Sequence, residues 1–87
     1  MDLGDKPPSI KNVREAKEWS PIMLAAMSGV SVLAIQRLES GKTYCPTYET
    51  MIRLARALET SAEDLWAGQV VEYHRIWAER REASNAG

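Results

Sequence analysis

The chain has 87 residues, of which 45% are apolar and 26% are charged, and its formal net charge is −1. Such a length allows one domain with a core, and the composition excludes both a disordered chain and an overall polycation. A single cysteine excludes an internal disulfide, and no apolar run is long enough to span a membrane. The polar N-terminal residues lack the apolar stretch of a signal peptide, so the sequence predicts a cytoplasmic protein.

Residues with catalytic chemistry are scarce. His74 and Cys45 are the only histidine and the only cysteine, and no group of potential ligands has the spacing of a metal site. The sequence also lacks a Gly-rich phosphate loop and a nucleophile elbow. We interpret Cys45 as a turn residue before Pro46 and His74 as a polar residue on a helix, rather than as the pair of a small hydrolase. The sequence therefore predicts no enzyme activity, no metal and no cofactor.

The first predicted elements are a flexible lead-in over residues 1–9 and a helix from about Ile10 to Glu18. Ser9 is the expected N-cap, because its hydroxyl can accept a backbone N–H of the first turn. A second helix is predicted to start at Ser20 and Pro21, where a hydroxyl cap precedes the residue that best tolerates the first helical position.

A tight turn follows the second helix at Gly29, because glycine adopts positive φ without a steric penalty. Ser31 then caps a third helix, from about Val32 to Glu39, and Gly41 ends it. Two short helices joined by a Gly-containing turn are typical of a helix-turn-helix. The residues that pack this pair of helices are predicted to be Leu24, Ala25, Val30, Ile35 and Leu38.

Three further helices are predicted after the third. A fourth helix is predicted from about Tyr48 to Leu58, and Ser61 caps a short fifth helix that Gly68 interrupts. A last helix then runs from about Gln69 to Glu82, and the residues after it are expected to fray. The fourth helix is predicted to bury one face, formed by Tyr48, Met51, Ile52, Ala55 and Leu58.

The C-terminal segment, residues 67–87, carries a large apolar surface for its length. Two interpretations remain open. If the helix folds back, its aromatic side chains enlarge the core; if it projects, they form a two-fold dimer interface in which one patch meets itself. The residues of this possible interface are Trp66, Val70, Tyr73 and Trp77.

The stretch from Ile10 to Trp66 resembles the XRE-like helix-turn-helix family, the Cro and lambda-repressor type. The resemblance is carried by LAAMSGVS around the turn, IQRLESGK at the end of the third helix, PTYETMIRLARAL in the fourth and SAEDL in the fifth. It implies an all-α fold, a compact five-helix lambda-repressor-like domain over residues 10–66 with an additional C-terminal helix. It also implies a repressor-like transcriptional regulator, phage-type or antitoxin-like, that binds double-stranded operator DNA as a homodimer.

The resemblance also implies roles for individual residues. Arg14 and Glu39 match an ion pair that ties the first helix to the third. Among the positions that read bases, Arg37 suits guanine and Gln36 suits adenine. The complete base-reading set is Val32, Leu33, Gln36 and Arg37, and the phosphate-contacting set is Ser20, Ser40, Gly41, Lys42 and Thr47.

Several positions depart from the family pattern. Pro21 replaces a frequent glutamine, Glu18 replaces a frequent glycine, and the base-reading surface begins with the apolar Val32 and Leu33. Exposed neighbouring apolar residues are typical of a contact with some partner. An alternative function is therefore a protein-interaction module on the same scaffold, such as an anti-repressor or adaptor, with little DNA binding.

The roles of four further side chains are also predicted, and three of them have two possible roles. Arg53 and Arg56 either contact phosphates or are solvated on the outer face of the fourth helix. Tyr44 either stacks on a sugar–phosphate or covers the core, and Trp19 is expected to fill the core.

Overall fold

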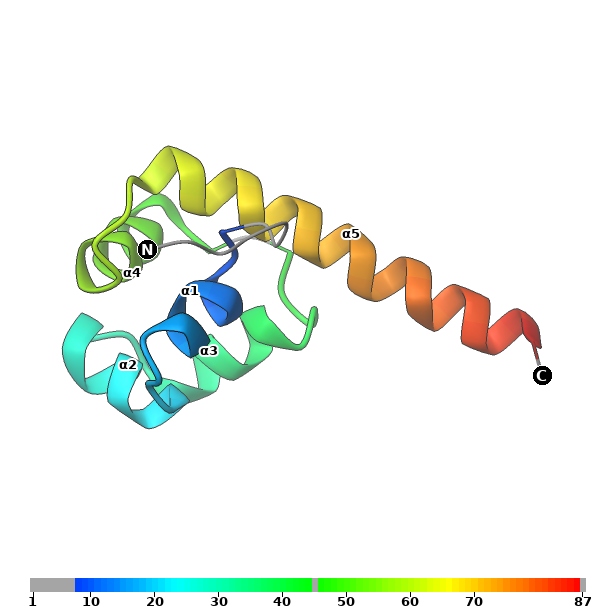
Figure 1. Cartoon of the computed structure of the whole chain (residues 1–87), viewed down its shortest axis with the longest axis horizontal. Helices are drawn as coiled ribbons and strands as arrows, with labels where there is room; N and C mark the ends of the chain where they lie inside the picture. Colours follow the sequence, from blue (N-terminus) through cyan, green and yellow to red (C-terminus); the bar gives the residue numbers. More distant parts are fainter. Residues whose placement is uncertain (1–7, 45, 87) are drawn as a thin grey trace.

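Helices are the only regular elements in the residues that the computed structural model describes, 8–44 and 46–86. The predicted lead-in before Pro8 and the predicted turn residue Cys45 lie outside the described residues. The all-α fold is confirmed. The helices are α1 (Ile10–Ala16), α2 (Pro21–Ser28), α3 (Val32–Glu39), α4 (Tyr48–Ala57) and α5 (Ala62–Ala86), and Figure 1 shows α5 crossing the body formed by the others and projecting beyond it.

A hydroxyl side chain caps the N-terminus of each helix. In every case its oxygen accepts the backbone N–H of the residue three positions later in the chain, at 3.1–3.3 Å. Such a bond satisfies one of the free N–H groups that a helix start exposes. The predicted caps of α1, α2, α3 and α5 are confirmed; the five capping residues are Ser9, Ser20, Ser31, Thr47 and Ser61.

The apolar core lies where α1 to α4 meet the first half of α5. The predicted packing of the helix pair is confirmed, with Leu24, Ile35 and Leu38 almost inaccessible to solvent and Ala25 packed beside them. Trp19 also packs against this cluster, as predicted. The core consists of Ile10, Val13, Leu24, Val30, Ile35, Leu38, Met51, Leu54, Ala55, Leu58 and Leu65.

The predicted buried face of α4 is wrong for Tyr48, which is 76% exposed. This residue occupies the first helical position, before α4 reaches the core. The inward face starts one turn later at Met51 and includes Leu54, which the prediction omitted. The error arises because periodicity gives a face but not the point along the helix at which the core begins.

The first helix ends at Ala16 rather than at Glu18. Glu18 adopts the left-handed conformation, with φ of 60°, at the corner where the family frequently has glycine. A side chain in this conformation costs about 1 kcal/mol relative to glycine. The corner brings the Trp19 carbonyl within 2.6 Å of the Arg14 Nη1 atom, and this contact requires the chain to leave the helix early.

The predicted interruption at Gly68 is wrong, because α5 is continuous from Ala62 to Ala86. Gly68 is instead a point of close approach. A Cβ at this position would lie 2.5 Å from the carbonyl carbon of Pro8 and 2.6 Å from its oxygen. The glycine therefore lets α5 lie against the segment that precedes α1.

We expect Gly68→Ala to lower the free energy of unfolding by about 1–3 kcal/mol, because the new methyl group collides with backbone. In an open helix the same change raises stability by about 1 kcal/mol. Urea denaturation monitored by circular dichroism distinguishes the two signs. A stabilised variant would show that the close approach to Pro8 does not constrain the fold.

One interpretation of the C-terminal helix, that it folds back, holds for the first half of α5, whereas the dimer interface of the other interpretation remains a prediction. The first half of α5 packs on the body through Leu65, Gln69 and Glu72, all buried. Its last turns project into solvent (Figure 1). The helix continues to Ala86, past the predicted end at Glu82, and the fraying expected at this end remains a prediction.

Candidate nucleic-acid interface

The turn between α2 and α3 has the geometry that its sequence predicts. Gly29 adopts φ of 76° and donates its N–H to the Ala25 carbonyl at 3.0 Å, and Val30 donates to the Ser28 hydroxyl at 3.1 Å. Val30 is buried just after the turn. These bonds fix the direction in which α3 leaves α2.

Burial divides α3 into an inner and an outer face. Ile35 and Leu38 are in the core, whereas Gln36 and Arg37 are exposed and Leu33 is 53% exposed. Among the predicted base-reading residues, Val32 is only half-buried and therefore the least available. The outer face combines one aliphatic side chain with two side chains that donate hydrogen bonds.

Arg14 and Glu39 lie in contact across α1 and α3. The guanidinium donates to both carboxylate oxygens at 2.8 Å, and both side chains are about nine-tenths buried. These hydrogen bonds raise the pKa of Arg14 above its ordinary value, so the guanidinium remains charged. With the third bond, from Nη1 to the Trp19 carbonyl, the pair fixes the C-terminal end of α3 to α1.

Gln69 is a site residue that sequence analysis missed. Its side chain is 1% exposed, its Oε1 accepts the Ile10 N–H at 3.2 Å, and its Nε2 donates to the Leu38 carbonyl at 2.9 Å. One amide thus satisfies the start of α1 and the last turn of α3. The sequence offered one signal of this role: Gln69 follows Leu65 by four positions, which places a polar residue on the inward face if the helix is continuous.

The loop after α3 is held by α5. The Trp77 indole N–H donates to the Gly41 carbonyl at 2.9 Å, and the Arg80 guanidinium donates to the Ser40 carbonyl at 2.7 Å. Gly41 is buried against Ile76. Of the three predicted phosphate contacts in this loop, only Lys42 has an exposed side chain.

Two other predicted phosphate contacts act as caps. The Ser20 hydroxyl accepts the Met23 N–H at 3.1 Å and remains exposed. The Thr47 hydroxyl accepts the Thr50 N–H and donates to the Thr50 hydroxyl at 3.0 Å. Ser20 therefore retains its proton for an outside acceptor, whereas Thr47 has an internal partner.

A family model described as Helix-turn-helix matches residues 10–65. The chain belongs to this helix-turn-helix family. It is similar to the "HTH-type transcriptional repressor RghR" of Bacillus subtilis (strain 168), with 37% identity over 71 residues, which are 79% of this chain. The chain spans about half of that relative, 53% of its length. No solved structure matches the chain significantly.

The cations of this helix-turn-helix domain differ in their availability. Within the described part of the chain, Arg37, Lys42 and Arg56 form no ion pair, whereas Arg53 pairs with Glu49 at 2.7 Å. Two exposed cations therefore lie on α3 and in the loop that follows it.

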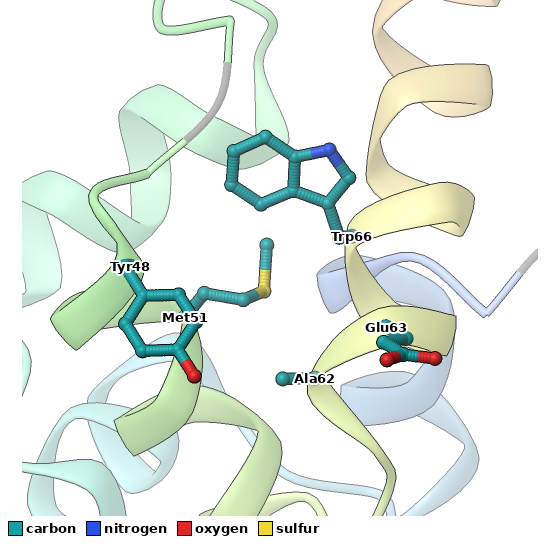
Figure 2. Close-up of a pocket in the computed structure, with 5 residues that line it drawn as sticks. All are labelled: Tyr48, Met51, Ala62, Glu63 and Trp66. Atoms are coloured by element: carbon teal, nitrogen blue, oxygen red, sulfur yellow. The ribbon is translucent and has the colours of Figure 1, made fainter.

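The aromatic residues predicted as a dimer interface are largely engaged within the helix-turn-helix chain itself. The Tyr73 ring meets the Tyr44 ring edge-on at 4.7 Å between centroids, which places Tyr44 against α5 although it stays 48% exposed. Trp77 binds Gly41, as described above. Figure 2 shows Trp66 over Met51, on the wall of an apolar surface pocket of about 360 Å³ between α4 and α5.

Other classes of site find no support in the described residues of this domain. Across 8–44 and 46–86, no group of three or more potential ligands is placed to hold a metal ion. Within those same ranges, no helix combines the length and apolarity needed to cross a membrane. His74 is exposed on α5, beside the Tyr44 and Tyr73 rings.

Proposed function

We propose that this protein is a transcriptional repressor that binds operator DNA sequence-specifically as a homodimer, with α3 in the major groove. The observation that carries the proposal is the outer face of α3. It exposes Gln36 and Arg37 on a helix whose inner face and C-terminal end are fixed by the core and by the Arg14–Glu39 pair. An α-helix fits the width of the major groove, about 12 Å.

The chemistry of this face suits direct contact with bases. Arg37 has two parallel donors for the O6 and N7 atoms of guanine, and the Gln36 amide can donate and accept at adenine. Leu33 supplies an apolar contact for a thymine methyl group. Val32, half-buried, contributes the smallest part of this contact.

Contacts to phosphate position the protein without reading sequence. Lys42 is the first exposed cation after the end of α3, and the Ser20 hydroxyl at the start of α2 has a proton to donate. Because Gly41 and Thr47 have internal partners, they contribute less to these contacts. The proposed role is binding rather than catalysis. Because its target is DNA, the proposed location is the cytoplasm.

The experiment that tests the function is selection from a random pool of duplex DNA at about 0.1 M salt, where screening is near physiological. We expect enrichment of a two-fold symmetric motif with half-sites about 34 Å apart, one helical turn. An unenriched pool, with affinity no better than for bulk DNA, would contradict the proposal. The relative that is a transcriptional repressor favours DNA binding over the alternative of a protein-interaction module.

We expect Arg37→Ala and Lys42→Ala to weaken binding in different ways. Arg37→Ala costs about 1–3 kcal/mol and relaxes specificity at one base pair, because a base contact is lost. Lys42→Ala weakens binding to all sequences alike and reduces the salt slope by about one, because one counterion fewer is released. Fluorescence anisotropy over a salt series measures both. Unchanged affinity of Arg37→Ala for the selected operator would contradict the base-reading role.

A further inference from the structure

One long face of α5 is exposed to solvent, and on it the His74 ring lies edge-on to the Tyr44 ring, with 5.8 Å between the centroids. Its residues follow each other at intervals of three and four, the spacing that keeps side chains in one line along two paired helices. All of them are exposed, and Val71 is 56% exposed. At 100° per residue, this face points away from Leu65, Gln69 and Glu72, which anchor α5 to the body. The outer stripe consists of Asp64, Ala67, Val71, His74, Ala78 and Arg81.

The outer stripe differs from the dimer interface expected from sequence. Tyr73 and Trp77 are occupied by Tyr44 and by the Gly41 carbonyl. Those contacts hold the loop after α3, and they would be lost if Tyr73 and Trp77 packed against a second molecule instead. The outer stripe offers a second molecule a surface without breaking any of these bonds.

The outer stripe is complementary to the same stripe of a second copy that runs antiparallel to it. In an antiparallel pair centred between Val71 and His74, each of these residues faces the other in the second copy. Ala67 then faces Ala78, and Asp64 faces Arg81. No ion pair engages either of these two end charges among the described residues. A two-fold axis therefore forms the Asp64–Arg81 pair twice, once at each end.

The side chains at the contact also suit close packing. Two alanines flank the centre on each side, and small side chains allow helix axes to approach to about 8 Å. The intervals of three and four repeat over the whole stripe, which favours a left-handed pair of helices. The stripe lies opposite Leu65, Gln69 and Glu72, so a second helix along it approaches α5 from the side away from this anchoring face.

We propose that α5 pairs antiparallel with α5 of a second copy of this chain through the outer stripe. The inference rests on the homodimer of the proposed function and specifies its interface. Contact of Val71 with His74 at the centre, together with the flanking alanines, supplies the attraction. The Asp64–Arg81 pairs fix the register, because a shift by one heptad separates them.

The first test compares two alanines of the projecting part of α5. Ala78→Arg places a large cation on the outer stripe, where we expect the dissociation constant of the dimer to rise at least about tenfold. Ala83→Arg is the matched control, since Ala83 is also exposed but lies on nearly the opposite side of the helix. Sedimentation equilibrium over a concentration series measures both. A monomeric wild-type protein, or equal effects of the two variants, overturns the proposal.

The second test exchanges the end charges. Asp64→Lys and Arg81→Glu each put like charges opposite one another, and we expect each to weaken the dimer at least about threefold. The double variant restores the opposite-sign pair and is expected to regain most of the affinity. A change in the stability of the helix ends would weaken the single variants but would not be reversed in the double variant. If the double variant dimerises as weakly as the single variants, the antiparallel register is therefore wrong. Selection of a DNA motif by a monomer would leave the DNA-binding proposal intact and remove only the interface.

Discussion

Replacing Glu39 by alanine is expected to lower the free energy of unfolding by about 3–5 kcal/mol, a large part of the stability of a small domain. The reason is the guanidinium that remains. Arg14 donates to both Glu39 oxygens at 2.8 Å and is about nine-tenths buried. Without the carboxylate, its charge stays desolvated with only the Trp19 carbonyl as a partner.

Two companion variants make the Glu39 experiment specific. Glu49→Ala removes an exposed pair with Arg53, and we expect a loss below about 1 kcal/mol there. The double variant Arg14→Met/Glu39→Leu removes both charges and should recover much of the stability, because no unpaired charge is left. Urea denaturation provides the free energies. A loss from Glu39→Ala no larger than that from Glu49→Ala would contradict the structural role of the buried pair.

Replacing Gln69 by leucine is the second substitution for which we expect a large loss. Leucine keeps the apolar part of the side chain but leaves the Ile10 N–H without its partner, whereas the Leu38 carbonyl loses one donor and still accepts the Gly41 N–H at 3.4 Å. An N–H that stays buried without a partner costs about 1–3 kcal/mol. The loss should also appear in hydrogen exchange, because the Ile10 amide at the start of α1 becomes less protected.

The matched control for this variant is Gln36→Leu, the same change on the exposed face of α3. It is expected to change the free energy of unfolding by less than about 0.5 kcal/mol. Thermal denaturation of the two variants side by side compares burial with exposure for one chemical change. Equal stability of the two variants would show that Gln69 does not join α1 to α3.

The parts of the fold that sequence analysis predicted depend on neighbouring residues. A serine cap, its N–H donor and the Gly29 turn are each defined within a few positions of the chain, so the starts of the helices and the turn were predicted correctly. The Arg14–Glu39 contact is distant in sequence, and it was expected only because the family resemblance supplied it.

The features that sequence analysis missed depend on segments that meet in space. Gly68 looks like a helix end, since glycine is a poor helix former, and only the approach of Pro8 reveals its role. Gly41 matched a phosphate loop, but the chain folds so that Ile76 and Trp77 cover it. Local pattern contains no information about which distant segment covers a residue. All of the predicted DNA contacts remain predictions.

The two bonds from α5 to the last turn of α3 and to the loop after it make the spacing of residues along α5 a determinant of the position of α3, and with it of the proposed DNA contacts. Gln69 and Trp77 bind the Leu38 and Gly41 carbonyls and are eight positions apart, which is about 12 Å along the helix. One inserted or deleted residue would turn one of these side chains by about 100° away from its carbonyl. Proteins that share this arrangement should therefore keep the length of this stretch, even where its exposed residues differ in sequence.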